Sequence, residues 1–300
     1  MSKIRKIALL LIAAGGILVL GALVMAGFHM ERFNTVDFQP VSYDLEGDFQ
    51  SIQIDVTECD VTLVYTPGQC RVETVDSQWI KTQVDASGGT LTVTRRNTTP
   101  WWRNIGIWWN GPGAKLAVTV YLPQSWYEQV DIRTVSGDID IPDDFSVGQL
   151  LAKTTSGDIT TQAGVSDGLD IQSVSGDIAA SSASGPVRAE STSGQILLEG
   201  VSAEALTVTT VSGDIRLEGV TAAGTVVLKT TSGDIRLAAF DGAQMEIKTV
   251  SGNVTGTVLS PKNFQTKTTS GDISVSPHDP AAGLCQVETI SGDVHIELWR

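Results

Sequence analysis

Apolar and polar residues alternate along most of the chain after residue 49, and the alternation falls into units that repeat every 18 to 21 residues. Apolar residues mostly stand six and four positions before a Ser-Gly pair and three and five positions after it. A period of two is typical of β-strands, because successive side chains point to opposite faces. Each unit is therefore predicted to form a strand, a tight corner at Ser-Gly, a second strand and a looser return.

The corner sequence is Ser-Gly-Asp or a close variant, and it occurs nine times. Its serines are Ser136, Ser156, Ser175, Ser193, Ser212, Ser232, Ser251, Ser270 and Ser291. Self-similarity at a short period marks a repeat architecture, in which each unit buries its apolar face against its neighbours. The sequence therefore predicts an all-β fold, a parallel β-solenoid of nine units of about 19 residues over residues 130–300.

The glycine of each corner is expected to have a structural role. A sharp corner often needs a residue that tolerates positive φ or the close approach of another chain segment. The residue two positions before each serine is always Thr or Ser, and we expect these hydroxyls to hydrogen-bond along the stack. The corner glycines are Gly137, Gly157, Gly176, Gly194, Gly213, Gly233, Gly252, Gly271 and Gly292.

An aspartate follows the glycine in seven of the nine corners. Our first interpretation is that each carboxylate accepts hydrogen bonds from backbone amides of the turn. The alternative is a calcium-stabilised rod, because like charges on strands about 4.8 Å apart repel each other and a divalent cation would relieve the repulsion. The aspartates are Asp138, Asp158, Asp177, Asp214, Asp234, Asp272 and Asp293.

The residue directly before the serine alternates along the chain. It is Val135 in the first unit, Thr155 in the second, and so on to Thr269 and Ile290 in the last two. Duplication of a two-repeat unit explains the alternation. A packing reason, in which alternate coils meet different neighbours, is the other explanation.

Residues 49–129 also alternate, but with less regular spacing. We predict that this strand-rich region caps the N-terminal end of the solenoid, because an open terminal coil exposes unpaired strand edges. Residues 31–48 are predicted to be a linker. No separate cap follows the last predicted strand, so we expect self-association or pairing with a partner strand at this C-terminal edge.

Residues 1–30 differ from the rest of the chain. Lys3, Arg5 and Lys6 precede an uncharged stretch at 7–28, whose 22 residues are enough to span a hydrocarbon core about 30 Å thick. The basic residues before the stretch predict a cytoplasmic N-terminus and an extracytoplasmic solenoid in a single-pass membrane protein. We expect a retained transmembrane helix, and the alternative is a signal peptide cleaved after Ala26.

Residues 100–109 interrupt the strand pattern and contain four of the seven tryptophans, Trp101, Trp102, Trp108 and Trp109. One interpretation is a loop folded over the end or flank of the solenoid. The other is an exposed aromatic tip that contacts the membrane or a partner protein, because tryptophan is favoured at both kinds of interface.

Charge and composition argue against several functions. Without the three basic residues at the start, the chain carries 17 basic and 34 acidic residues, a net charge of −17, which disfavours nucleic acid as a partner. The three cysteines are not spaced as a metal site. Cys59 and Cys70 flank an expected hairpin and are candidates for a disulfide, whereas Cys285 stands at an inward position of the repeat.

Catalytic motifs are weak. The three histidines have no spacing typical of a metal site or a catalytic triad, and neither a phosphate loop nor a dinucleotide fingerprint is present. Gly164-Val165-Ser166-Asp167-Gly168 fits a hydrolase pattern, but it lies between two repeats where no helix is expected. We therefore predict no catalytic residue, no metal and no cofactor.

The run of TVSGDI and TTSGDI units, preceded by a strand-rich segment ending in Val120-Tyr121-Leu122-Pro123, resembles a widespread bacterial family. That family is known as “putative adhesin” or as a β-strand-repeat domain of unknown function, and the resemblance covers residues 50–300. It implies a β-solenoid in the cell envelope, with roles in adhesion or envelope-stress response, and it brings no catalytic residues.

Together these points predict a non-enzymatic, membrane-anchored, extracytoplasmic protein that binds an unknown protein or glycan at the cell surface, or serves as a scaffold. One alternative is a β-helix enzyme acting on envelope polysaccharide, with acidic and basic residues displayed on one face. The second alternative is the calcium-stabilised rod.

Overall fold

The computed structural model describes residues 38–98 and 116–300. The chain divides into two units, residues 40–98 with 115–300 and residues 1–39 with 99–114, and the solenoid lies in the first. The regular elements of the described residues are all β-strands, which confirms the all-β prediction. The predicted membrane helix and the four tryptophans of residues 101–109 lie outside the described residues, and none of the described residues forms a helix able to cross a bilayer.

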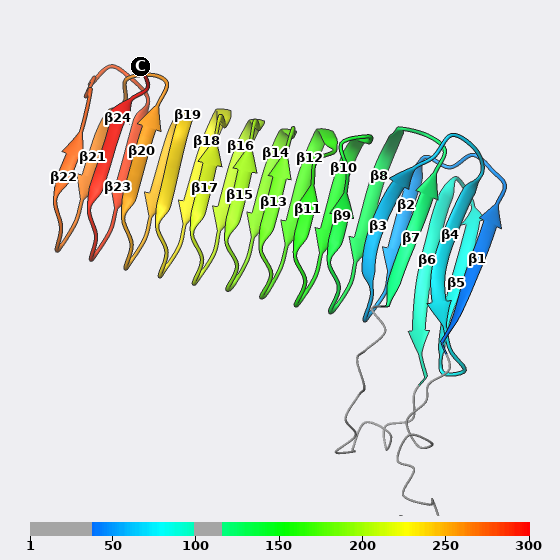
Figure 1. Cartoon of the computed structure of the whole chain (residues 1–300). Helices are drawn as coiled ribbons and strands as arrows, with labels where there is room; N and C mark the ends of the chain where they lie inside the picture. The colour runs from blue at the N-terminus through cyan, green and yellow to red at the C-terminus, as the bar shows by residue number, and fades with distance from the viewer. Residues whose placement is uncertain (1–37, 99–115) are drawn as a thin grey trace, which may run out of the picture. The chain divides into compact units, whose positions relative to one another are not determined.

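The strands form two sheets, and each coil of the solenoid contributes one strand to each sheet (Figure 1). Sheet B contains β2 (Ser51–Asp55), β5 (Ile80–Ser87), β6 (Thr90–Asn97), β8 (Trp126–Arg133), β10 (Ser146–Lys153), β12 (Gly164–Gln172), β14 (Ser184–Glu190), β16 (Ser202–Thr209), β18 (Thr221–Lys229), β21 (Asn263–Lys267) and β23 (Leu284–Glu288). Sheet A contains β3 (Asp60–Tyr65), β4 (Cys70–Asp76), β7 (Ala117–Leu122), β9 (Ile139–Ile141), β11 (Ile159–Thr161), β13 (Ile178–Ser181), β15 (Ile196–Glu199), β17 (Ile215–Glu218), β20 (Val254–Val258), β22 (Ile273–Val275) and β24 (Val294–Leu298). The long strand β19 (Ile235–Lys248) takes part in both sheets.

Equivalent residues of consecutive coils pair in parallel and in register. In sheet A, Ile159 pairs with Ile139 on one side and Ile178 on the other, and all three are buried. In sheet B, Leu150 pairs in the same way with Val130 and Leu169. The apolar columns read from the sequence therefore form the interior of a parallel β-solenoid, as predicted.

The N-terminal end does not follow chain order. Strand β2 lies between β6 and β8, and β3 lies between β7 and β9, so the first coil in sequence is the second coil in space. The outermost coil, β6–β7, is covered by two antiparallel strands, β5 on β6 and β4 on β7. These antiparallel strands end the parallel stacking at this end.

Part of the predicted linker is a strand. Strand β1 (Gln39–Leu45) pairs with β4 and lies within residues 31–48. Its alternate residues Val41, Tyr43 and Leu45 are partly buried, and the hydroxyl of Tyr43 donates a hydrogen bond to the carbonyl of Thr82. This short alternation is the signal that the linker interpretation overlooked.

At the C-terminal end, too, the order of the coils in space differs from their order in the sequence. The last strand does not form the edge of the solenoid, and that prediction is wrong. Strand β24 lies between β20 and β22, and β23 lies between β19 and β21. The last coil in sequence is therefore enclosed by two others, and β21–β22 is the outer coil in the described structure. Accordingly, Ile273 is 44% exposed, although its counterparts in inner coils are fully buried.

The cysteines are free, so the suggested disulfide between Cys59 and Cys70 is wrong. Burial raises the pKa of Cys70 to about 11 and that of Cys285 to about 12. Cys285 packs in the interior, as predicted from its inward position. The thiols therefore contribute as small apolar side chains.

Candidate binding surfaces

The corner glycines are required because successive corners lie directly on one another. A Cβ atom on Gly157 would lie 1.8 Å from the carbonyl oxygen of Gly137, and one on Gly233 would lie 1.9 Å from that of Gly213. Among the nine, only Gly271 has a positive φ, of 149°. Close approach of the backbone, rather than an unusual φ, therefore explains most of these glycines.

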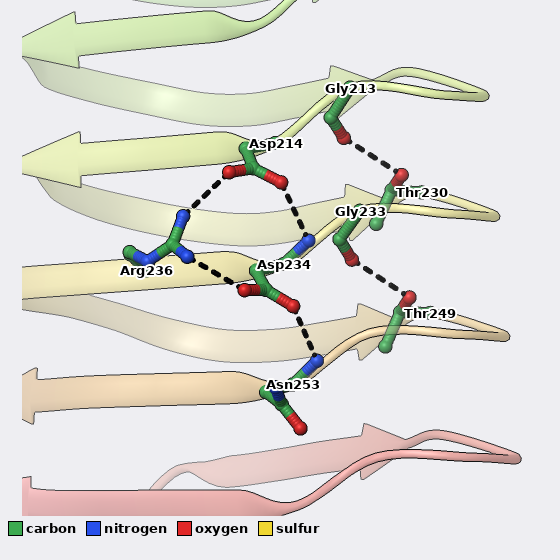
Figure 2. A network of polar contacts seen from close by, with 8 residues as sticks. All are labelled: Gly213, Asp214, Thr230, Gly233, Asp234, Arg236, Thr249 and Asn253. Carbon is green, nitrogen blue, oxygen red and sulfur yellow. Dashed lines mark hydrogen bonds and ion pairs between the residues drawn. The ribbon is translucent and has the colours of Figure 1, made fainter.

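The buried hydroxyls two positions before each serine bind the same carbonyls. The hydroxyl of Thr230 donates to the carbonyl of Gly213 at 3.1 Å, and that of Thr249 donates to Gly233 at 3.1 Å (Figure 2). The hydroxyls thus bond along the stack, with glycine carbonyls as acceptors. The hydroxyl of Thr134 donates to the carbonyl of Cys59 in the same way, and equivalent bonds to glycine are made by Thr154, Ser173, Ser191, Thr210, Thr268 and Thr289.

The aspartates form a second ladder beside the first. A carboxylate oxygen of Asp214 accepts a hydrogen bond from the backbone N–H of Asp234 at 2.9 Å, and Asp234 accepts one from Asn253 at 2.9 Å (Figure 2). Equivalent bonds are accepted by Asp60, Asp138, Asp158, Asp177, Asn253 and Asp293. This arrangement supports our first interpretation of the aspartate column, in which the carboxylates bind backbone amides.

Arg236 joins two members of this ladder. Its guanidinium lies 2.6 Å from a carboxylate oxygen of Asp214 and 2.7 Å from one of Asp234. Partial burial raises the pKa of Asp214, but the N–H of Asp234 and the guanidinium together outweigh that effect and hold the pKa below its usual value. In the described chain, no group of three or more acidic, His or Cys side chains is arranged to hold a metal ion.

Two exposed side chains project from every corner, the serine and the residue before it. The apolar members of this edge are Val135, Val174, Val211, Val250 and Ile290. Because these side chains face outward, packing inside the solenoid does not explain their alternation with threonine. The coil of Ile290 lies in space between those of Val250 and Thr269, so two apolar residues are neighbours there. The alternation is therefore regular in the sequence but not in space, which supports the duplication of a two-repeat unit.

A hollow of about 470 Å³ lies on the outer face of sheet B, across strands β8 to β16. Small residues at one repeat position, Gly168, Pro186 and Ala205, form its floor between larger neighbours. The bulge that shifts the register between β10 and β12 places Asp167 beside them. The remaining outward-facing side chains of the lining are Gln129, Gln149, Leu151, Asp170, Arg188 and Thr207.

The sequence-based selection of site residues missed this hollow, although the signal was present. The floor residues stand seven positions before Ser175, Ser193 and Ser212, where the two preceding units have Gln129 and Gln149. Three small residues in consecutive repeats predict a depression once the repeats are stacked. The four tryptophans, in contrast, follow β6 in the sequence and lie outside the described residues.

Cys59 stands where the later coils have their corner glycine. Its carbonyl accepts the hydroxyl of Thr134 at 3.1 Å, and a Cβ on Gly137 would lie 1.7 Å from the same carbonyl. Its thiol accepts a hydrogen bond from the buried guanidinium of Arg95 at 3.0 Å. Residues 57–60 are thus a tenth corner, hidden in the sequence because Glu58 and Cys59 replace Ser and Gly.

The family model described as Toastrack DUF4097 matches residues 49–238 and, in a second overlapping match, residues 166–299. The chain belongs to the Toastrack DUF4097 family. Membership of Toastrack DUF4097 confirms the resemblance noted from the SGD repeats. No curated protein matches the chain.

Several solved structures are similar to this Toastrack DUF4097 chain. A “putative adhesin” from Parabacteroides distasonis is 13% identical with a TM-score of 0.47, and the match covers 88% of this chain and 98% of that one. A “putative lipid binding protein” from the same organism is 14% identical with a TM-score of 0.42, covering 86% and 96%. A “putative adhesin” from Parabacteroides merdae is 14% identical with a TM-score of 0.39, covering 88% and 97%. Similarities this distant do not identify a ligand for the present chain.

Proposed function

We propose that this protein is a non-enzymatic binding module of the bacterial cell envelope, and that the hollow on sheet B is its ligand site. The observation that carries the proposal is the shape of that surface, an open hollow that crosses five consecutive coils of a regular scaffold. Its volume of about 470 Å³ falls within the range of ligand pockets, roughly 300–1,000 Å³. A site open along the stack suits an extended ligand such as a glycan chain.

The chemistry of the hollow fits a ligand rich in hydroxyl groups. Amides of Gln129 and Gln149 can both donate and accept hydrogen bonds. Two of the charged groups around them are already paired, since Arg188 lies 2.8 Å from Glu190 and Asp170 lies 3.8 Å from Lys153, and Asp167 adds one further carboxylate. The polar groups thus offer hydrogen bonds with little net charge. This pattern favours a neutral glycan over a strongly charged polymer.

The test is a binding panel with purified full-length protein against cell-wall and host glycans. Ala205→Trp fills the hollow, and we expect it to abolish saturable binding. Ala179→Trp makes the same change on the outer face of sheet A and is the matched control. Binding that survives Ala205→Trp would remove the hollow as the site, and turnover of a glycan would favour the polysaccharide enzyme.

Membrane anchoring is a separate part of the proposal. The apolar stretch at 7–28 supports an N-terminal anchor with the solenoid outside the cytoplasm. Membrane fractionation and the mass of the mature protein test it. A mature chain that begins at residue 27 would show cleavage after Ala26 and a secreted protein.

A further inference from the structure

The corner edge of the solenoid is the most apolar exposed feature of the described residues. Of the eleven exposed large apolar side chains there, five lie on this edge, from Val135 to Ile290, with exposures of 40–54%. They stand in one row along the stack, with threonines between most of them, because each corner bonds to the one before, as when the N–H of Ser156 donates to the carbonyl of Val135. An apolar row of this kind, repeated over the length of a stack, marks an interaction surface.

The row is rigid before it meets any partner. The hydroxyl of Thr154 donates a hydrogen bond to the carbonyl of Gly137 in the preceding corner. The N–H of Asp158 donates one to the carboxylate of Asp138 in that same preceding corner. Such bonds recur from coil to coil. Binding at this edge therefore orders few additional groups, which lowers its entropic cost.

Charges flank the row differently on its two sides. On the sheet A side runs the aspartate column. On the sheet B side, three positions before each serine, the charged residues are mostly basic. These basic residues are Arg133, Lys153, Lys229, Lys248 and Lys267, and the first four also form half-exposed ion pairs with carboxylates of their own chain. The edge is therefore an apolar row between an acidic column and a mainly basic column.

Such an edge is complementary to itself in one orientation only. If a second copy is rotated by 180° about an axis parallel to the stack, its acidic column faces the basic column of the first copy on both sides. If the stacks run in opposite directions, the aspartates of one copy face those of the other. Opposite charges favour the first arrangement, and facing carboxylates disfavour the second.

One coil supports this pairing in detail. Glu190 is one of two acidic members of the mainly basic column, and its own coil has Gln195 in place of the aspartate. In the parallel arrangement Glu190 faces Gln195 of the other copy, so two carboxylates do not meet. Glu288 would face Asp293 of the other copy. The charge of Glu288 is partly compensated by Lys248 of its own chain, 3.4 Å away.

We propose that the corner edge binds the same edge of a second copy, with the two solenoids parallel and in register. Nine coils at about 4.8 Å each, with an edge about 10 Å wide, give roughly 430 Å² per copy. That is about half of the ~800 Å² per partner found in stable complexes. The dimer is therefore weak and reversible, and tethering both copies to one membrane would favour it.

Single-cysteine cross-linking of the full-length protein in membranes tests the proposal. In a parallel, in-register dimer each position meets its own copy, so Val135→Cys, Val174→Cys, Val211→Cys and Val250→Cys should all form disulfide-linked homodimers on mild oxidation. The parent chain, whose three cysteines are buried, gives the background. Thr160→Cys, exposed on the outer face of sheet A, is the control and should stay monomeric.

The same set of variants can overturn the proposal. In an antiparallel dimer only the cysteine nearest the two-fold axis would cross-link. Four variants that cross-link no better than Thr160→Cys would show that this edge does not meet a second copy. Products containing another protein would assign the edge to that protein.

A charge reversal provides a second measurement. Lys229→Glu places a carboxylate opposite Asp234 of the second copy, and we expect the dissociation constant of the dimer to rise about tenfold relative to the parent chain. Arg216→Glu makes the same change of charge on the outer face of sheet A, where we expect no effect. Analytical ultracentrifugation of both variants measures the difference, and equal affinities would contradict the proposed pairing.

Discussion

The hydroxyl of Thr230 donates a hydrogen bond to the carbonyl of Gly213, a residue of the preceding coil, at 3.1 Å. Removing this hydroxyl leaves a buried carbonyl without that partner. We expect Thr230→Val, which keeps the shape of the side chain, to lower the free energy of unfolding by about 1–2 kcal/mol. Urea denaturation measures the change.

The neighbouring residue is the matched control for that substitution. Thr231 is exposed, and the same position holds Val211 and Val250 in the adjacent coils. Thr231→Val should therefore leave stability unchanged within about 0.5 kcal/mol. Equal effects of the two substitutions would show that the hydroxyl bond at Thr230 contributes nothing specific.

A second prediction concerns the two kinds of glycine. In Gly233→Ala the new Cβ would lie 1.9 Å from the carbonyl oxygen of Gly213, so backbone must shift in both coils. We expect the free energy of unfolding to fall by more than about 3 kcal/mol, or the protein not to fold at all. In Gly200→Ala nothing lies within 4 Å of the Cβ, and only the φ of 60° is unfavourable. That variant should lose about 1–2 kcal/mol, and a similar loss in both would refute the close-approach explanation.

Acid should weaken the ladder at Asp214. Because the folded-state pKa of this carboxyl lies below its usual value of 3.8, its stabilising effect is complete above that value and is lost as the pH falls through the folded pKa. Arg236→Gln removes one cause of the lowering and brings the folded pKa closer to 3.8, so the loss should be smaller and should be complete at higher pH. Thermal unfolding between pH 2 and 6 (a range of about four units around the usual pKa) measures the shift. Arg216 is a more distant cation, so Arg216→Gln should change the pH dependence less than Arg236→Gln.

The interleaved C-terminal end predicts an order of hydrogen exchange that differs from chain order. Strand β24 is bonded on both sides, by β20 and β22, whereas β22 has β24 on one side. The amides of β24 should therefore exchange more slowly than those of β22, although β24 is nearer the end of the sequence. Exchange followed by mass spectrometry compares the two strands. Faster exchange in β24 would contradict the enclosed position.

Calcium should have no effect on stability if the aspartate ladder binds amides. Each hydrogen bond from a backbone N–H to a carboxylate, such as that from Asp158 to Asp138, uses one oxygen that a cation would need. A ligand that does not bind the folded state leaves the melting temperature unchanged. We expect a difference of less than about 1 °C between calcium and chelator. A clear rise with calcium would restore the calcium-stabilised rod.

The interior of each coil could be predicted from sequence because its signal is local. The isoleucine or valine three residues after each serine, such as Ile159 or Val254, must point inward once a period of two and a sharp corner are accepted. The role of the glycines followed from the same corner. The family could also be recognised from the sequence, because the SGD repeats are characteristic of it.

The order of coils at the two ends could not be predicted in the same way. Every unit presents nearly the same strands, so the coil of Ser251 can stack equally well, by pattern alone, on that of Ser270 or that of Ser291. Which pairing occurs depends on differences between whole coils and their return loops. The hydrogen bonds of Arg236 to two aspartates were missed for a related reason, because they join side chains of different coils that are neighbours only after stacking.

The enclosed strands at both ends change how the protein can come apart. In an ordinary solenoid the terminal unit can detach alone and the next one follows. Here the first coil in sequence, β2–β3, and the last, β23–β24, each lie between two other coils. Releasing either of these two coils breaks two sets of backbone bonds at once, so both resist detachment, and the pairing of β2–β3 is complete only when β6–β9, far along the sequence, are in place.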